Sequence, residues 1–259
     1  GFGGIASALR LRALGYDVTL LEKLNQIGGR ARVFNVNGFK HDAGPTVITA
    51  PFLFDELFQL FGEDRRTYLK FVPLDPWYRF YFHDCSFFDY CKSINDTKNQ
   101  ISKFSVSDAN AYEKLLDVSK EIFDIGFTKL SDKPFSSFSF MLKQIPSLIK
   151  LRSYLTVSQL VKKYLKHPKI QSAFSIHPLL VGGNPFETTS IYALIHFLER
   201  NWGVFFCMGG TGKIIEELRS LMIRQGIKIK LNINVEKVNL VKRKITSVQC
   251  SGDKVFECD

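Results

Sequence analysis

The residues with the clearest chemical potential lie at the start of the chain. Gly1, Gly3 and Gly4 stand at the head of an Ala/Leu-rich segment, and Glu22 follows them. Gly1 would let the backbone approach a pyrophosphate, and Gly4 would let a helix pack closely on a sheet. A helix N-terminus offers free N–H groups and a partial positive charge to phosphates. Because Glu22 lies about twenty residues past the glycines, its carboxylate can accept hydrogen bonds from ribose hydroxyls. This spacing predicts a dinucleotide site.

A βαβ unit must position these residues. Residues 5–14 predict a helix that ends at Gly15, residues 18–21 predict a strand, and Gly28-Gly29-Arg30 closes the unit. The G-x-G-x-x-G motif also requires a glycine two places before Gly1 and a hydrophobic strand before that glycine. We therefore expect the sequence to be a fragment that begins inside the motif. The alternative is a glycine-rich turn ahead of an ordinary surface helix.

Further along, the chain predicts a hairpin and a small-residue turn. Residues 31–34 and 39–41 are expected to be strands joined by Asn37-Gly38, a dipeptide typical of two-residue hairpin loops. The segment Asp42-Ala43-Gly44-Pro45-Thr46 would let the backbone approach a flat ligand, although a tight turn alone also explains it. A helix is expected at residues 51–61.

The middle of the chain predicts a different mixture of elements. Residues 77–82 and 87–88 read as paired strands, and residues 108–130 as a long helix with Ser107 or Asp108 as its N-cap. A second helix follows Thr189 or Ser190 and reaches Trp202. No nucleophile or set of metal ligands accompanies His177 and His196 in the sequence, so we expect structural roles for both and predict no metal site.

The last third of the chain returns to sheet structure. Residues 209–213 resemble a P-loop, but Cys207 replaces its first glycine and Ile214 its Ser/Thr, so a plain glycine turn before a helix at 214–224 is expected. Strands are expected at residues 228–231, 235–238, 245–250 and 255–258. The predicted fold class is α/β: a discontinuous Rossmann-like dinucleotide domain at residues 1–50 and 204–259, with an inserted mixed α/β (α+β) substrate domain at 51–203.

The composition predicts a cellular compartment for the protein and a basic surface on it. The five cysteines are scattered without C-x-x-C spacing, as expected for reduced thiols in a cytosolic protein. Eight of the ten units of net positive charge lie in residues 133–186, a stretch without Asp or Glu. One-sign charge of this length suggests an anionic partner, either nucleic acid or an anionic membrane surface.

Residues 135–155 favour the membrane. Apolar side chains, Met141, Ile145, Leu148 and Ile149, can share one helical face, while Lys143, Ser147 and Lys150 share another. That pattern is typical of a helix lying in a membrane interface, and also of an amphipathic helix packed on its own domain. We expect a peripheral protein of the cytoplasmic membrane face that does not bind nucleic acid.

Taken together, the sequence resembles the bacterial and fungal type of FAD-dependent phytoene desaturases, within the amine-oxidase-like flavoproteins. The strings that carry the resemblance are Gly1-Phe2-Gly3-Gly4, Leu20-Leu21-Glu22-Lys23, Gly28-Gly29-Arg30-Ala31, Asp42-Ala43-Gly44-Pro45-Thr46-Val47-Ile48-Thr49, Leu179-Leu180-Val181-Gly182-Gly183-Asn184-Pro185-Phe186, Trp202-Gly203-Val204 and Gly209-Gly210-Thr211-Gly212. The first three strings are shared with many flavoproteins, whereas the long central strings are more specific to carotenoid desaturases.

The resemblance implies FAD as the cofactor and a site for each part of it. The turn at Gly1, Gly3 and Gly4 would hold the pyrophosphate, Glu22 the adenosine ribose, and Arg30 the phosphate–ribose region. The remaining implied contacts come from Lys23, Gly29, the Gly44-Pro45-Thr46 segment near the isoalloxazine, and the backbone of Val235 at the adenine. Some relatives carry an Arg-Asp pair near the positions of Ser139 and Phe140, where this sequence has neither residue type, so no catalytic acid or base is assigned.

The implied function is desaturation of phytoene in carotenoid biosynthesis. A polyene hydrocarbon offers only C–H bonds, so the cofactor must accept the hydrogens: a hydride from an allylic carbon to flavin N5, with loss of a proton from its neighbour. Alternatives within the fold are a carotenoid oxidase, a diapophytoene desaturase and a polyene isomerase. A non-catalytic, membrane-peripheral isoprenoid-binding protein is the alternative from another class.

Overall fold

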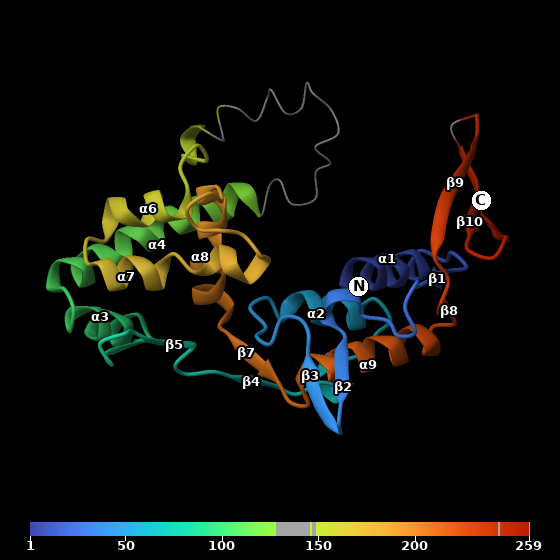
Figure 1. Cartoon of the computed structure of the whole chain (residues 1–259), viewed down its shortest axis with the longest axis horizontal. Coiled ribbons are helices and arrows are strands. Elements are labelled where there is room, and N and C mark those ends of the chain that lie inside the picture. The colour runs from blue at the N-terminus through green and yellow to red at the C-terminus, as the bar shows by residue number, and fades with distance from the viewer. Residues whose placement is uncertain (128–145, 147–148, 243, 259) are drawn as a thin grey trace. The chain divides into compact units, whose positions relative to one another are not determined.

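The computed structural model describes residues 1–127, 146, 149–242 and 244–258. The chain divides into two compact units, one made of Gly1–Val72 and Phe206–Asp259 and the other of Pro73–Phe205. Both contain helices and strands (Figure 1), which confirms the predicted mixed α/β class. Strands β4 (Phe71–Pro73) and β7 (Phe205–Cys207) pair where the chain passes from one unit to the other.

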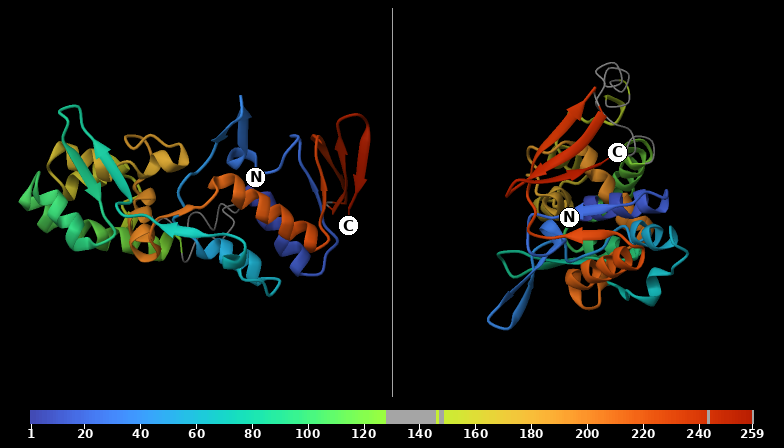
Figure 2. Two further views of the ribbon diagram at one scale, coloured as in Figure 1. Left: turned by 90° about the horizontal axis from the view of Figure 1, so that it is seen from below. Right: turned by 90° about the vertical axis from the view of Figure 1, so that its right-hand side faces the viewer.

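The first unit is built on two helix–strand pairs. Helix α1 (Phe2–Ala13) leads to β1 (Thr19–Leu21), and α9 (Gly210–Arg224) leads to β8 (Lys228–Lys230). The two strands pair in parallel, and α1 and α9 lie side by side (Figure 2). Parallel strands that each follow a helix form the unit of a Rossmann-like sheet, as predicted.

Helix α1 forms where the Ala/Leu-rich segment predicted it. Ile5, Ala8 and Leu9 are buried, and the helix is followed by Gly15, whose φ of +92° lies in the left-handed region. Gly4 is exposed among the described residues, and an added Cβ would have no heavy atom within 4 Å, so its close packing on a sheet stays a prediction. The sheet described beside α1 consists of β1 and β8.

The predicted hairpin is present, but its first strand begins later. Residues Gly29–Ala31 form a 3-10 turn, η1, and the strands are β2 (Val33–Val36) and β3 (Phe39–Asp42). Asn37 and Gly38 both have positive φ, 51° and 83°. A two-residue loop with these angles matches the right-handed twist of paired strands, so the Asn-Gly signal was read correctly.

Residues 51–72 belong to the first unit, whereas the sequence analysis placed them in the inserted domain. Helix α2 (Phe52–Gln59) packs against α1, where the rings of Phe2 and Phe54 are 5.7 Å apart. Arg65, in the 3-10 turn η2 (Arg65–Thr67), is buried and donates to Asp55 at 2.8 Å. These apolar and ionic contacts hold residues 51–72 to the first unit. The spacing of apolar residues in the sequence does not predict such contacts.

The first unit ends in a three-stranded antiparallel sheet of order β11-β10-β9. Its strands are β9 (Val235–Val241), β10 (Lys244–Cys250) and β11 (Lys254–Glu257). The last two pair across Ser251-Gly252-Asp253, as the sequence predicted. Val235, the first residue of β9, pairs with Cys250.

The second unit opens with the predicted hairpin of β5 (Tyr78–Tyr81) and β6 (Phe87–Tyr90). Helix α3 (Ile94–Ser102), which the sequence analysis missed, precedes the long helix α4 (Val106–Gly126). The N-cap of α4 is Ser105, not Ser107 or Asp108. Asp108 is instead buried, and its carboxylate accepts the backbone N–H groups of Lys166 and His167 at 2.7–2.9 Å.

Helices complete the second unit. They are α6 (Val157–Tyr164), α7 (Pro168–Phe174), the 3-10 turns η3 (His177–Val181) and η4 (Ser190–Ala193), and α8 (Leu194–Trp202). Their core joins α4 through buried Ile122, Leu151, Leu160 and Ala193. Of the amphipathic segment at residues 135–155, Met141, Lys143, Ile145, Ser147 and Leu148 lie outside the described residues, as do Lys133, Ser139 and Phe140. Among the helices that are described, none has both the length and the apolarity to cross a membrane.

Candidate functional site

The start of α1 lies at the first glycines of the predicted motif. Gly1 is its N-cap, no side chain caps this end, and the first turn holds no acidic residue. The first N–H groups of an α-helix have no partner within the helix, and the helix dipole adds a partial positive charge there. These donors and the partial positive charge suit a phosphate group.

Two glycine segments close on this helix end. A Cβ on Gly29 would lie 3.0 Å from the Cα of Gly1, and Gly29 has a φ of +58°. A Cβ on Gly44 would lie 2.5 Å from the carbonyl oxygen of Arg30 and 2.8 Å from the Cα of Ala31. The turn after β3 thus rests on the Gly29–Arg30 turn, which rests on the start of α1. The three glycine-containing strings are therefore linked by backbone contacts, and at Gly29 and Gly44 a side chain would not fit.

Glu22 presents its carboxylate to the same place. It follows β1, and its backbone is held on both sides, since its N–H donates to the Lys230 carbonyl and its carbonyl accepts from Ile233, both at 2.9 Å. One carboxylate oxygen accepts the Leu24 N–H at 3.0 Å, and the other lies 4.0 Å from the backbone nitrogen of Gly1. The second oxygen can therefore accept hydrogen bonds from a ligand bound at the start of α1.

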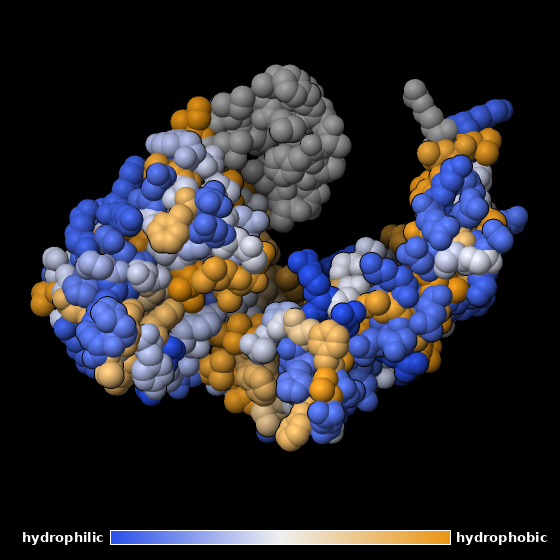
Figure 3. Space-filling model, viewed as in Figure 1, coloured by the Kyte–Doolittle hydropathy of each residue, from blue (hydrophilic) through white to orange (hydrophobic). Residues whose placement is uncertain are grey.

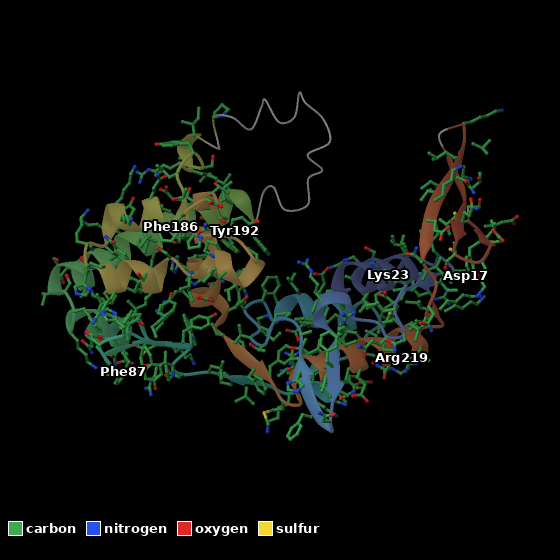
Figure 4. All side chains as sticks on the ribbon, in the orientation of Figure 1. Asp17, Lys23, Phe87, Phe186, Tyr192 and Arg219 are labelled. Atoms are coloured by element: carbon green, nitrogen blue, oxygen red, sulfur yellow. The ribbon has the colours of Figure 1, made fainter. Side chains whose placement is uncertain are left out.

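The other predicted site residues line the edges of this arrangement. They are near the residues just described in sequence, and all are exposed: Gly3, Lys23, Arg30, Pro45 and Thr46. Figure 4 labels Lys23 near α1. Val235 is 42% exposed. It lies two residues after Ile233, whose N–H donates to the backbone carbonyl of Glu22. The structure thus brings Glu22 and Gly29 beside Gly1, and Gly44 against the neighbouring backbone of Arg30 and Ala31.

Sequence reasoning missed a contact between Asp42 and Thr211. The side chain of Asp42 accepts the N–H of Thr211 at 3.1 Å, and the Thr211 hydroxyl donates to the carbonyl of Pro45. Helix α9 accordingly begins at Gly210, four residues earlier than expected, and Asp42 satisfies its first turn. The only signal in the sequence was an acidic residue just before the small-residue turn, and nothing linked it to a glycine turn 169 residues away.

A cavity of about 840 Å³ borders the same turn of α9. It lies between residues 25–27, the β2–β3 hairpin and α9, and Leu231 also lines it. Its charged lining mixes signs: Arg32, Lys40, Asp42, Lys213, Glu216 and Arg219. Lys213 is already engaged, because it donates to Glu217 at 2.6 Å, and this hydrogen bond raises the pKa of Lys213. Sequence reasoning did not predict the cavity, since its walls come from segments far apart in the chain.

His177 and His196 belong to a buried polar cluster in the second unit. His177 Nε2 lies 2.9 Å from one oxygen of Glu199, and Tyr78 donates to the other at 2.7 Å. His196 Nε2 lies 2.9 Å from the Phe174 carbonyl, and the two imidazole rings are 3.9 Å apart. Burial, and then the Glu199 carboxylate, raises the pKa of Tyr78. These partners agree with the structural role expected for both histidines; among the described residues, no group of three or more His, Cys, Asp or Glu could hold a metal ion.

We expect this cluster to make the protein less stable in mild acid. Burial, aided by His177 and Arg200, lowers the pKa of His196 well below 6.5. The unfolded chain therefore binds a proton below about pH 6.5 that the folded chain excludes, and stability rises with pH until that value and is then flat. Urea unfolding at pH 5.5 should give a lower free energy than at pH 7.5, by roughly 1 kcal/mol from this residue. His196→Gln should remove that difference, and an unchanged pH dependence in the variant would contradict the assignment.

The chain matches the family of flavin containing amine oxidoreductases over residues 2–259. It is 40% identical over 259 residues to a lycopene-forming phytoene desaturase of Pseudescherichia vulneris, covering all of this chain and 53% of that protein. A second lycopene-forming phytoene desaturase, from Pantoea ananas, is 41% identical over 256 residues, with 99% of this chain and 52% of that protein covered. The chain thus spans about half the length of the curated relatives it matches.

Solved structures agree on the fold. An oxidoreductase from Methanosarcina mazei has a TM-score of 0.59 at 20% identity, covering the whole of this chain and 56% of that one. Wild-type putrescine oxidase bound to putrescine has a TM-score of 0.61 at 14% identity, covering 98% of this chain and 53% of that one. With three glycine segments linked by backbone contacts at the start of α1 and a carboxylate beside Gly1, the chain belongs to the family of flavin-containing amine oxidoreductases.

Proposed function

We propose that this chain forms the dinucleotide-binding part and part of the substrate domain of an FAD-dependent desaturase that acts on a phytoene-like polyene. The observation that carries the proposal is the close approach of Gly29 to Gly1 and of Gly44 to the backbone of Arg30 and Ala31, with the Glu22 carboxylate beside Gly1. The identity of 40% to a lycopene-forming phytoene desaturase narrows the substrate class.

The residues present fit FAD. The first N–H groups of α1 would hold the pyrophosphate, and the absence of side chains at Gly1 and Gly29 leaves room for its oxygens. Glu22 would accept hydrogen bonds from the adenosine ribose, with Lys23 and Arg30 as nearby cations for the phosphate–ribose region. Gly44, Pro45 and Thr46 would form a wall beside the isoalloxazine, and the backbone of Val235 would meet the adenine.

When bound, the flavin supplies the electron sink for removing hydrogens from an allylic CH₂–CH₂ pair. The protein must hold the hydrocarbon against that ring and keep water away. No side chain of the described residues is assigned to proton transfer, because the buried histidines are engaged in the cluster around Glu199.

Pigment analysis tests the activity. The gene that encodes this chain, expressed in full in phytoene-accumulating cells, should convert colourless phytoene into coloured carotenoids with more conjugated double bonds. Glu22→Ala should lower the yield of coloured product, whereas Glu56→Ala, which removes only an exposed partner of Arg10, should not. Unchanged phytoene with normal protein levels would contradict the proposal.

The same extracts distinguish a related activity. The chain also matches a 4,4'-diapolycopene oxygenase of Methylomonas sp at 23% identity and a 4,4'-diapolycopen-4-al dehydrogenase of Metabacillus indicus at 27%. Products that gain oxygen, identified by mass, would favour a carotenoid oxidase over a desaturase. A colourless protein without flavin and without product would favour a non-catalytic isoprenoid-binding role.

We further propose that the second unit contacts an anionic membrane at its cytoplasmic face. Lys162 and Lys163 are exposed in the last turn of α6, and Lys162 Nζ lies 6.0 Å from the ring of Phe186, which is 67% exposed. Figure 4 labels Phe186, and Figure 3 shows hydrophilic and hydrophobic areas side by side on the visible face of this unit. Lysines beside exposed apolar side chains suit a lipid headgroup boundary.

Liposome binding tests this surface. The full-length protein should sediment with vesicles that contain anionic lipid, and the double variant Lys162→Glu, Lys163→Glu should bind less, because two positive charges at the contact become negative. The charge-matched control, Lys237→Glu with Lys254→Glu, changes exposed lysines of the β9–β11 sheet and should bind like the wild type. Equal binding by the two double variants would exclude the surface around α6.

A further inference from the structure

We propose that Asp42 and Thr211 are positioning residues that set the place of the Gly44-Pro45-Thr46 segment in the cofactor site. This inference rests on the proposed function, because its consequence is measured through FAD. Helix α9 supplies no pyrophosphate contact in the proposed site, but its hydrogen bonds would hold one wall of that site in place.

The first of the two contacts lies at the start of α9. Gly209 and Gly210 have φ values of +89° and +76°, and a Cβ on Gly210 would lie 2.6 Å from the Asp42 Oδ2. The carboxylate can therefore sit directly over the first turn, where it accepts the Thr211 N–H at 3.1 Å. An anion at this position also satisfies the helix dipole. The N-terminus of α9 is thus occupied by a side chain of the protein itself.

The second contact is made by the side chain of Thr211. Thr211 is buried, and its hydroxyl donates to the carbonyl oxygen of Pro45. Asp42 precedes Gly44 and Pro45 follows it, so α9 forms hydrogen bonds with the small-residue turn on both sides of that glycine. The Ala43 N–H adds a bond to the Arg32 carbonyl at 3.1 Å. The backbone from Asp42 to Pro45 therefore has little freedom.

Backbone contacts connect these two hydrogen bonds to the candidate cofactor site. Gly44 is pressed against the Arg30 carbonyl and the Ala31 Cα, and Gly29 against Gly1. Helix α9 reaches the same turn a second time, since a Cβ on Gly28 would lie 3.2 Å from the side chain of Ile215. Releasing either hydrogen bond to α9 frees the turn that carries Gly44 while leaving α1 and Glu22 in place.

The test uses the full-length protein and two pairs of variants. Thr211→Val removes the hydroxyl donor at nearly constant volume, and Thr211→Ser retains it. Asp42→Ala removes the acceptor at α9, and Asp42→Asn retains one, because asparagine also caps helices. For each variant we would measure the dissociation constant of FAD from the deflavinated protein, the visible circular dichroism of the bound flavin, and the melting temperature without FAD.

Thr211→Val and Asp42→Ala should weaken FAD binding by roughly tenfold and change the flavin dichroism, whereas Thr211→Ser and Asp42→Asn should stay within about twofold of the wild type. The matched control is Thr97→Val in the second unit, which removes another buried hydroxyl that donates to backbone carbonyls. It should lower the melting temperature without changing the affinity for FAD.

Three outcomes overturn the inference. Wild-type affinity and dichroism in both Thr211→Val and Asp42→Ala would show that these hydrogen bonds do not position the wall. Equal weakening in Thr211→Ser and Thr211→Val would show that the hydroxyl is not the cause. A wild-type protein that binds no FAD would overturn the proposed function itself and this inference with it, and the first two outcomes leave the proposed function standing.

Discussion

Replacing Gly44 with alanine is expected to leave the full-length protein almost without bound FAD. The new Cβ would lie 2.5 Å from the Arg30 carbonyl oxygen and 2.8 Å from the Ala31 Cα, and both are backbone atoms that cannot rotate aside. The turn that carries Gly44 must then move away from the Gly29–Arg30 turn. We expect at least about a hundredfold weaker binding of FAD and a loss of about 1–3 kcal/mol in the free energy of unfolding, the usual range for overpacking. The flavin-to-protein absorbance ratio and urea unfolding measure the two effects.

Gly126→Ala is the matched control for this substitution. Gly126 lies in the last turn of α4, and a Cβ there would have only ordinary contacts, 3.7 Å from Leu194 and 3.8 Å from Ile191. Alanine is the better helix former, so this variant should bind FAD normally and be equally or slightly more stable. Gly44→Ala protein that purifies with one FAD per chain would show that the site does not depend on the close approach at Gly44.

Replacing Glu199 with alanine is expected to destabilise the second unit more than any other single truncation discussed. The carboxylate is fully buried and accepts from Tyr78 at 2.7 Å while it contacts His177 Nε2 at 2.9 Å. Its removal leaves the half-buried hydroxyl of Tyr78 and the buried imidazole of His177 without this partner, and a cavity as well. Losing one member of a buried pair typically costs about 3–5 kcal/mol, which would show in urea unfolding followed by tryptophan fluorescence.

Two further variants separate charge from shape at this position. Glu199→Gln retains an oxygen acceptor for Tyr78 at similar volume, so it should be more stable than Glu199→Ala. Glu187→Ala truncates an exposed glutamate of the same unit and should change stability by no more than about 0.5 kcal/mol. If Glu199→Ala unfolds at the same urea concentration as Glu187→Ala, then the buried cluster does not support the fold.

Local signals in the sequence predicted most elements. The Ala/Leu-rich run gave α1, Asn37-Gly38 gave the hairpin between β2 and β3, and Ser251-Gly252-Asp253 gave the turn before β11. Helix starts were less accurate. Ser105, rather than Ser107 or Asp108, caps α4, because Asp108 is drawn to the Lys166 and His167 N–H groups of a distant segment.

By itself the sequence determined the type of site, because glycines, Glu22 and the helix they precede are neighbours whose geometry depends on short-range torsion angles and hydrogen bonds. It also indicated membership in a flavoprotein family, since the glycine strings follow one another in order. Only the tertiary structure decided that Gly44 abuts Arg30, that Asp42 caps a helix 169 residues away, and that residues 51–72 pack with the first unit. Those contacts depend on how segments far apart in the sequence pack against one another. Such packing produces no periodic pattern in the sequence from which it could be predicted.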